Sequence, residues 1–153
     1  MKNIGNQVAT RLDSSFIRDP IFYWLLITPI IFWFVIYIEN LSTSKLDTKT
    51  AILVIVVLPV IEEVIFRGIL QPWLAIKYSQ KIMNITQANL ITSCIFALLH
   101  LFEHKLTMAL GTFLPSLVFG YARDRYKGIV PSIILHSSYN GGYFLIGTQL
   151  INN

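Results

Sequence analysis

Residues 52–70 read ILVIVVLPVIEEVIFRGIL, an apolar run that contains two adjacent glutamates, Glu62 and Glu63, and one arginine, Arg67. The run has about the length that a bilayer-spanning helix needs. A charge at the centre of a bilayer costs roughly 2.5–3.5 kcal/mol even on the most lenient insertion scale. We therefore expect a membrane helix whose ionisable groups serve chemistry or transport.

The chain as a whole has the composition of a membrane protein. Of its 153 residues, 54% are hydrophobic and only 13% are charged, whereas soluble domains carry about 25% charged residues. The net charge is +4, and the lysines and arginines lie mostly between apolar runs. This distribution is typical of residues that set membrane topology, and it does not favour a nucleic-acid-binding surface.

Apolar segments of about the length of a membrane span cover residues 21–38, 51–70, 85–102, 107–122 and 129–150. They predict an all-α fold: a polytopic transmembrane helix bundle of about five spans, forming a single domain over residues 20–153. In residues 1–19, apolar side chains recur every four positions. We expect this part to be either an interfacial helix or a disordered tail.

Positive charge predicts the orientation of the bundle. Apart from Arg67, eight lysines and arginines fall in the N-terminal region and in the loops at 71–84 and 123–128, and three fall in the other loops. Loops rich in these residues stay in the cytoplasm. The N-terminus is therefore expected inside and the C-terminus outside.

Glu63 and Arg67 are four residues apart, so on a helix they share a face and can pair. Glu62 points about 100° away from Glu63. Because a low dielectric disfavours so many charges together, we expect Glu63 to stay ionised against Arg67 and Glu62 to exchange a proton near neutral pH. That behaviour is typical of a general base. The alternative, a structural ion pair between helices, leaves Glu62 unexplained.

Two further polar clusters lie on later apolar segments. His100 comes late in the third segment, where a histidine at the membrane interface is the simpler interpretation. His136 and Asn140 are four residues apart and share a face of the last segment. Their simpler interpretation is hydrogen bonding between helices.

Together these side chains have the chemistry for attack of water on a carbonyl group. Glu62 and a histidine would take the proton of the water, while Asn140 with a histidine would stabilise the oxyanion. Glu62, His100 and His136 are equally a catalytic zinc set with one position open for water. The spacing of the residues does not separate these two mechanisms.

The three clusters, in this order, resemble the intramembrane proteases of the CAAX-protease and bacteriocin-processing family. The motifs of that family are Glu-Glu-x-x-x-Arg, Phe-x-x-x-His and His-x-x-x-Asn or Asp. They are found here from Glu62 to Arg67, from Phe96 to His100 and from His136 to Asn140. The resemblance covers about residues 51–145.

The resemblance implies that Glu62 activates the water, with support from Glu63 and Arg67. His100, His136 and Asn140 would complete the site. Both a glutamate-based mechanism without metal and a zinc-dependent one have been assigned to the family. We favour the first because Arg67 would weaken the binding of a cation, so no cofactor is expected and zinc is the alternative.

The short chain, with RGILQPW at residues 67–73 and DPIFYW at residues 19–24, is similar to the subgroup associated with bacterial JDVT-CTERM sorting signals. That similarity implies a protein of the bacterial inner (plasma) membrane whose partners are membrane lipid and a protein substrate with a C-terminal hydrophobic or processed tail. A non-catalytic membrane accessory or immunity protein with the same fold is the alternative. A proton-coupled carrier that titrates at Glu62 is a third hypothesis, and the lack of an internal repeat argues against it.

Overall fold

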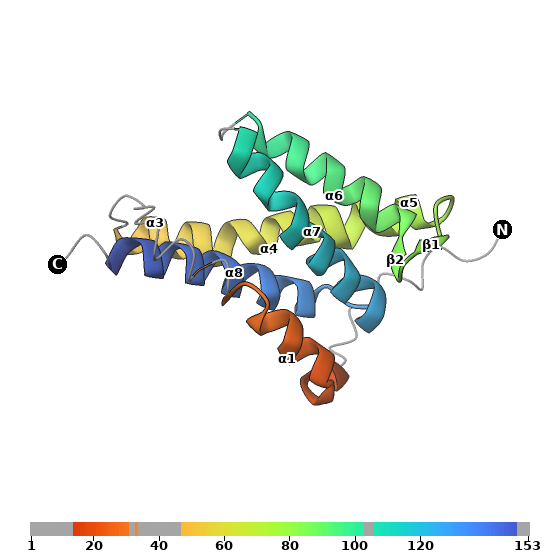
Figure 1. The fold of residues 1–153 in the computed structure, drawn as a ribbon, viewed down its shortest axis with the longest axis horizontal. Coiled ribbons are helices and arrows are strands. Elements are labelled where there is room, and N and C mark those ends of the chain that lie inside the picture. The colour runs from red at the N-terminus through yellow and green to blue at the C-terminus, as the bar shows by residue number, and fades with distance from the viewer. Residues whose placement is uncertain (1–13, 31–32, 34–46, 103–105, 150–153) are drawn as a thin grey trace.

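The computed structural model describes residues 14–30, 33, 47–102 and 106–149, and it is helical apart from one short hairpin (Figure 1). This confirms the predicted all-α class. The elements are η2 (Ser14–Arg18), α1 (Pro20–Ile27), α3 (Thr48–Ile52), η3 (Leu53–Val57), α4 (Leu58–Glu63), η4 (Val64–Leu70), α5 (Gln71–Ala75), β1 (Lys81–Ile82), β2 (Ile85–Thr86), α6 (Gln87–His100), α7 (Leu106–Tyr126) and α8 (Val130–Gln149).

The elements from α3 to α5 follow one another along a single axis (Figure 1). We call this series the glutamate rod, because α4 carries Glu62 and Glu63. Its segments η3 and η4 are π-helical: the N–H of Leu58 binds the carbonyl of Leu53, and the N–H of Gln71 binds that of Phe66. Each bond reaches five residues back, so the rod departs from the α-helical hydrogen-bond register in two segments.

A proline follows each π-helical segment and leaves one carbonyl without its backbone donor. After η3, the residue that would donate to the carbonyl of Val54 is Pro59, which has no N–H. The side-chain amide of Asn140, on α8, donates to that oxygen instead, with an Nδ2···O distance of 2.9 Å. A side chain of the last helix thus completes the backbone pairing of the rod.

At the C-terminal end of helix α1, a side chain again donates to a carbonyl that a proline leaves free. The helix begins at Pro20 after Asp19, whose carboxylate caps the helix by accepting from the N–H of Ile21 at 3.0 Å. Pro29 cannot donate to the carbonyl of Leu25, and the hydroxyl of Tyr139 on α8 donates to it at 2.6 Å. Helices α1 and α8 are therefore joined directly.

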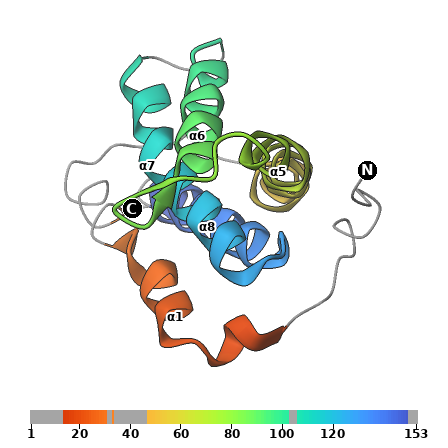
Figure 2. The same cartoon turned by 90° about the vertical axis from the view of Figure 1, so that its right-hand side faces the viewer.

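Helices α6 and α7 pack side by side above α8, and α8 lies between them and α1 (Figure 2). Gly120 allows the close approach of α6 and α7, since a Cβ atom there would collide with the side chain of Asn89. Asn89 donates from Nδ2 to the carbonyl of Leu117 at 3.0 Å, and its Oδ1 accepts from Ser93. Polar side chains thus hold the two helices together.

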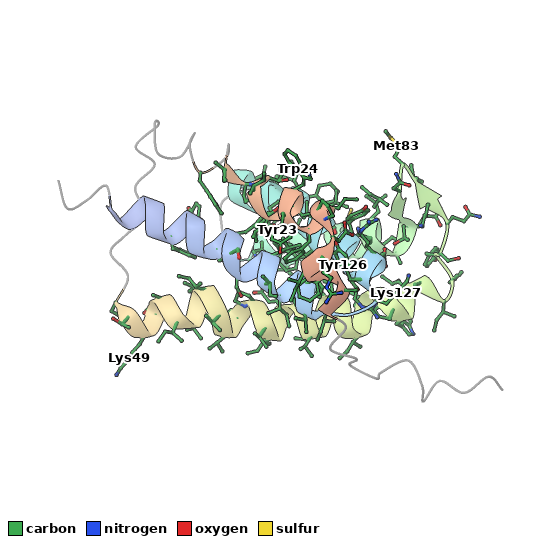
Figure 3. The ribbon with its side chains drawn as sticks, turned by 90° about the horizontal axis from the view of Figure 1, so that it is seen from below. Tyr23, Trp24, Lys49, Met83, Tyr126 and Lys127 are labelled. Carbon is green, nitrogen blue, oxygen red and sulfur yellow. The ribbon has the colours of Figure 1, made fainter. Side chains whose placement is uncertain are left out.

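The apolar core lies where η2, α1, α7 and α8 meet. Its buried members are Phe16, Phe22, Phe119, Ala122, Tyr126, Leu135 and Tyr139. The ring of Tyr126, which is labelled against α1 in Figure 3, lies 6.2 Å from that of Phe22. At the edge of this core, Arg125 donates from Nε to Asp19 at 2.7 Å.

The predicted segments 85–102, 107–122 and 129–150 correspond closely to α6, α7 and α8. The prediction of one continuous helix over 21–38 is wrong, because α1 ends at Ile27 and a turn follows at Thr28 and Pro29. Residues 31–32 and 34–38 lie outside the described residues, as do 1–13 of the N-terminal tail.

The segment at 71–84, expected to be a loop, contains α5 and the first strand of a β-hairpin instead. Met83 and Asn84 form its tip, both with positive φ. Among the described residues, no single helix combines the length and the apolar character that crossing a bilayer requires.

Candidate active site

The centre of the candidate site is the ion pair that the sequence predicted between Glu63 and Arg67. Both side chains are fully buried, and Nη1 of Arg67 lies 3.3 Å from Oε1 of Glu63. The guanidinium is held from α7, where its Nη2 donates to the carbonyl and the hydroxyl of Ser116 at 2.8 and 2.6 Å. It also lies 5.1 Å from the ring of Phe96 and 5.7 Å from that of Phe119. Arg67 is therefore fixed on several sides.

His136, on α8, lies between the two glutamates. Its Nδ1 is 2.8 Å from Oε1 of Glu63, and its Nε2 is 3.6 Å from Oε2 of Glu62. A Glu63 carboxylate paired with Arg67 can only accept, so Nδ1 carries the proton of this bond. In the neutral ring Nε2 is then an acceptor that faces Glu62. The ring stacks on Phe119 with centroids 4.6 Å apart, which fixes its plane.

Glu62 is the accessible member of the cluster. Its side chain is 27% exposed, compared with 6% for His136 and none for Glu63. Two consecutive carboxylates thus reach opposite nitrogens of one imidazole, one from inside the protein and one from the accessible side. This arrangement gives the two glutamates different environments, as the sequence predicted.

His100, on α6, belongs to the same neighbourhood. Its Nδ1 lies 2.8 Å from the carbonyl oxygen of Phe96, which can only accept, so Nδ1 is the protonated nitrogen. The Phe96 ring lies 4.4 Å from His100 and 5.9 Å from His136. The ring of Phe66, on the rod, lies 5.0 Å from that of Phe96. Side chains of the rod, α6 and α8 therefore converge on one place.

Asn140 is placed apart from the carboxylates. It lies one helical turn beyond His136, but its amide is directed at the carbonyl of Val54 on the rod. A carboxamide has two N–H donors, and this bond uses one of them. The contact that the structure gives Asn140 is thus with the main chain.

Several side chains of the site could not be predicted as such. Ser116 binds Arg67, Phe119 supports His136, and Arg123 donates from Nε to the main-chain carbonyl of Arg67 at 3.0 Å. Serine and phenylalanine are common on apolar helices, and the sequence indicates Arg123 only as a charge of a cytoplasmic loop. The sequence carries no local signal for their partners, because each is about 50 residues away or on another helix.

The alternative mechanism requires Glu62, His100 and His136 to bind a zinc ion together. In the part of the chain that the structure describes, no group of three or more His, Cys, Asp or Glu side chains is arranged to hold a metal ion. Glu63 accepts from Nδ1 of His136, and the buried guanidinium of Arg67 lies on the other side of the same carboxylate.

Comparison with known proteins places the chain in a family. A family model described as type II CAAX prenyl endopeptidase Rce1-like matches residues 44–142. The chain belongs to this family. Its membership confirms the predicted resemblance and supports assignment as a peptidase, since the Rce1-like family is one of proteases. The matched range includes every candidate site residue, from Glu62 to Asn140. No curated protein and no solved structure matches the chain.

Proposed function

We propose that the chain is an intramembrane endopeptidase that cleaves a membrane-anchored protein precursor with a water molecule activated by Glu62 and His136. The observation that carries this proposal is the placement of His136, with one ring nitrogen on buried Glu63 and the other facing accessible Glu62. A buried acid that orients an imidazole, beside a second acid open to substrate, is the arrangement that general acid–base chemistry needs.

In the proposed first step, one water molecule donates hydrogen bonds to Oε2 of Glu62 and to Nε2 of His136. Its oxygen attacks the carbonyl carbon of the scissile peptide, and Glu62 takes the released proton. Glu63 and Arg67 do not exchange protons in this scheme. They hold His136 in the tautomer that presents an acceptor at Nε2, because Glu63 occupies Nδ1.

In the second step, the tetrahedral intermediate collapses. The C–N bond breaks, and Glu62 returns its proton to the leaving nitrogen, so the products are an amine and a carboxylic acid that keeps the second proton of the water. Donors are needed for the oxyanion before this step. We assign them to a ring N–H of His100, on α6, and to the second N–H of Asn140, one turn beyond His136 on α8.

The distribution of polarity supports a lipid environment. Large apolar side chains are exposed along the rod at Ile52, Leu53, Val56, Val57, Leu58, Val60, Ile61, Val64, Ile65, Ile69, Trp73 and Ile76. Polar side chains are buried between the helices instead, among them Glu63, Arg67, Gln71, Asn89 and Ser116. An apolar exterior around a polar, hydrogen-bonded interior suits a protein whose solvent is a bilayer.

The basic residues support the predicted orientation. Lys127 lies at the same end of the molecule as the hairpin tip at Met83, and Lys49 lies at the opposite end (Figure 3). We propose an integral protein of the bacterial inner membrane with several spans and with the Lys127 end in the cytoplasm. The proposed substrate is a precursor with a C-terminal hydrophobic tail, as in the JDVT-CTERM-associated subgroup, cleaved near the bilayer.

The decisive experiment uses the purified chain in detergent and a membrane precursor that accumulates in a strain lacking it. Glu62→Gln keeps the shape of the side chain and removes the base, so we expect turnover to fall by at least about 100-fold. Asp19→Asn makes the same chemical change outside the cluster and should keep turnover. Full activity of Glu62→Gln would exclude the mechanism, and a phenotype that survives this variant would favour the accessory protein.

The same assay tests the zinc alternative. We expect cleavage to continue after prolonged treatment with a strong chelator, because the proposed steps use only protein groups and water. Activity that is lost on chelation and restored by zinc would show that a metal is required.

A further inference from the structure

The second π-helical segment, η4, leaves a backbone acceptor unpaired beside the ion pair. The N–H of Gln71 binds the carbonyl of Phe66, five residues back. In this register, residue 72 would bind the carbonyl of Arg67, but residue 72 is a proline without an N–H. A buried carbonyl without a donor is costly, so the π register needs a donor from elsewhere.

Arg123 supplies that donor. From the last turn of α7, its Nε donates to the carbonyl oxygen of Arg67 at 3.0 Å, and the side chain is half-buried. The same arrangement is found one segment earlier, where Asn140 donates to the Val54 carbonyl that Pro59 leaves free. The glutamates of α4 lie between these two contacts.

The position of the donor selects one register over the other. In an α-helix, Pro72 would leave free the carbonyl of Gly68, four residues back. Arg123 reaches the carbonyl of Arg67 instead, so its bond favours the π register. The register matters because it sets the direction in which the Arg67 side chain leaves the rod, toward Glu63 and Ser116.

We propose that Arg123 is a positioning residue. Its Nε bond to the main chain of Arg67 holds the π register of η4, and that register aims the guanidinium at Glu63. The kinetic consequence rests on the proposed peptidase function, whereas the structural consequence does not.

Two substitutions separate the hydrogen bond from the charge. Glutamine places its Nε2 the same number of bonds from the main chain as Nε of arginine, so Arg123→Gln keeps the donor and removes the charge. Arg123→Met places a methyl group there and removes both. We expect Arg123→Met to lower kcat about tenfold with KM unchanged, and Arg123→Gln to restore kcat to within about threefold of the unsubstituted chain.

Hydrogen exchange provides a readout that needs no substrate. In Arg123→Met, peptides that cover residues 64–76 should exchange about tenfold faster, while those from α8 stay unchanged. Arg123→Gln should exchange like the unsubstituted chain. Arg125→Met, which removes another arginine of the same helix end, controls for loss of charge.

The outcomes separate the two proposals. Equal effects of Arg123→Gln and Arg123→Met, or no effect of Arg123→Met on exchange, would overturn the positioning role. If Arg123→Met does not fold, a slow or inactive Arg123→Gln alone would overturn it. Should the unsubstituted chain cleave no precursor, the proposed function fails and the exchange data still decide the role of Arg123.

Discussion

At the scale of single residues, the site depends on a carboxylate that is never exposed. Oε1 of Glu63 accepts from both Arg67 and His136, while Oε2 has no protein partner among the described residues. The guanidinium compensates the buried charge, and the imidazole receives its orientation from the same oxygen. Glu62, one residue away, is 27% exposed. The two neighbouring glutamates thus differ in burial and in partners.

The difference in burial predicts that one substitution will mainly lower stability and the other will mainly lower turnover. Arg67→Met leaves Glu63 buried without its cation, so we expect the free energy of unfolding to fall by about 3–5 kcal/mol. Glu62→Gln changes a partly exposed side chain, so it should alter stability by less than about 1 kcal/mol while abolishing turnover. Thermal unfolding in detergent measures both.

A double variant supplies the control. Glu63→Gln combined with Arg67→Met removes both charges and should recover much of the stability that Arg67→Met loses. No recovery would contradict a buried ion pair as the source of the loss.

The sequence predicted much of this site, because helical spacing is a local property. The pairing of Glu63 with Arg67 follows from their separation of four residues, and the structure shows it. The bond of Asn140 to Val54 was not predictable, because it depends on which carbonyl the π register of η3 leaves free. The spacing of His136 and Asn140 indicates a shared face and does not say what each side chain binds.

At the scale of elements, three prolines have a common effect. Pro29, Pro59 and Pro72 each withhold a backbone donor, and side chains of α7 or α8 bind the carbonyls of Leu25, Val54 and Arg67. In the sequence, a proline inside a helical segment indicates that the backbone hydrogen bonding is interrupted there. The sequence could not indicate the register change, because π and α segments share their composition.

The close packing of α6 against α7 predicts how glycine-to-alanine substitutions in α7 will change stability. Alanine at Gly120 would push Asn89 away from the carbonyl of Leu117, so we expect Gly120→Ala to lower the unfolding free energy by about 1–3 kcal/mol. Gly111, on the same helix, has open space around its Cα, so Gly111→Ala should be neutral or stabilising. Chemical denaturation compares the two, and equal effects would contradict the packing argument.

At the scale of the whole molecule, the start of the described chain is bound to its later helices. Phe16 packs on Tyr126, with ring centroids 6.1 Å apart, and Asp19 accepts from Arg125. The hydrogen bond from Arg125 holds the pKa of the Asp19 carboxyl below its ordinary value, and the N–H of Ile21 adds to the effect. This contact therefore makes stability depend on pH.

The direction of that dependence follows from the lowered pKa. The contribution of Asp19 is complete above its ordinary value of 3.8 and is lost as the pH falls through the lower folded value. Asp19→Asn keeps the helix cap and removes the charge. We expect its melting temperature to lie below that of the unsubstituted chain near neutral pH, and the gap to close in strong acid. A gap that widens in acid would contradict this account.

The proposed topology can be tested directly. An odd number of spans places the two ends of the chain on opposite sides of the membrane, with the N-terminus in the cytoplasm. Reporter fusions at both ends should therefore give opposite results. If both reporters are active on the same side, the count of about five spans is wrong.

The hydroxyl of Tyr139 on the carbonyl of Leu25 connects positions 114 residues apart. During synthesis, the opening helix leaves the ribosome long before that tyrosine does. Until residue 139 has been synthesised, the nascent chain therefore lacks this donor for the Leu25 carbonyl, and a molecule truncated ahead of that residue never acquires it. The end of α1 is thus completed only after α8 has been made.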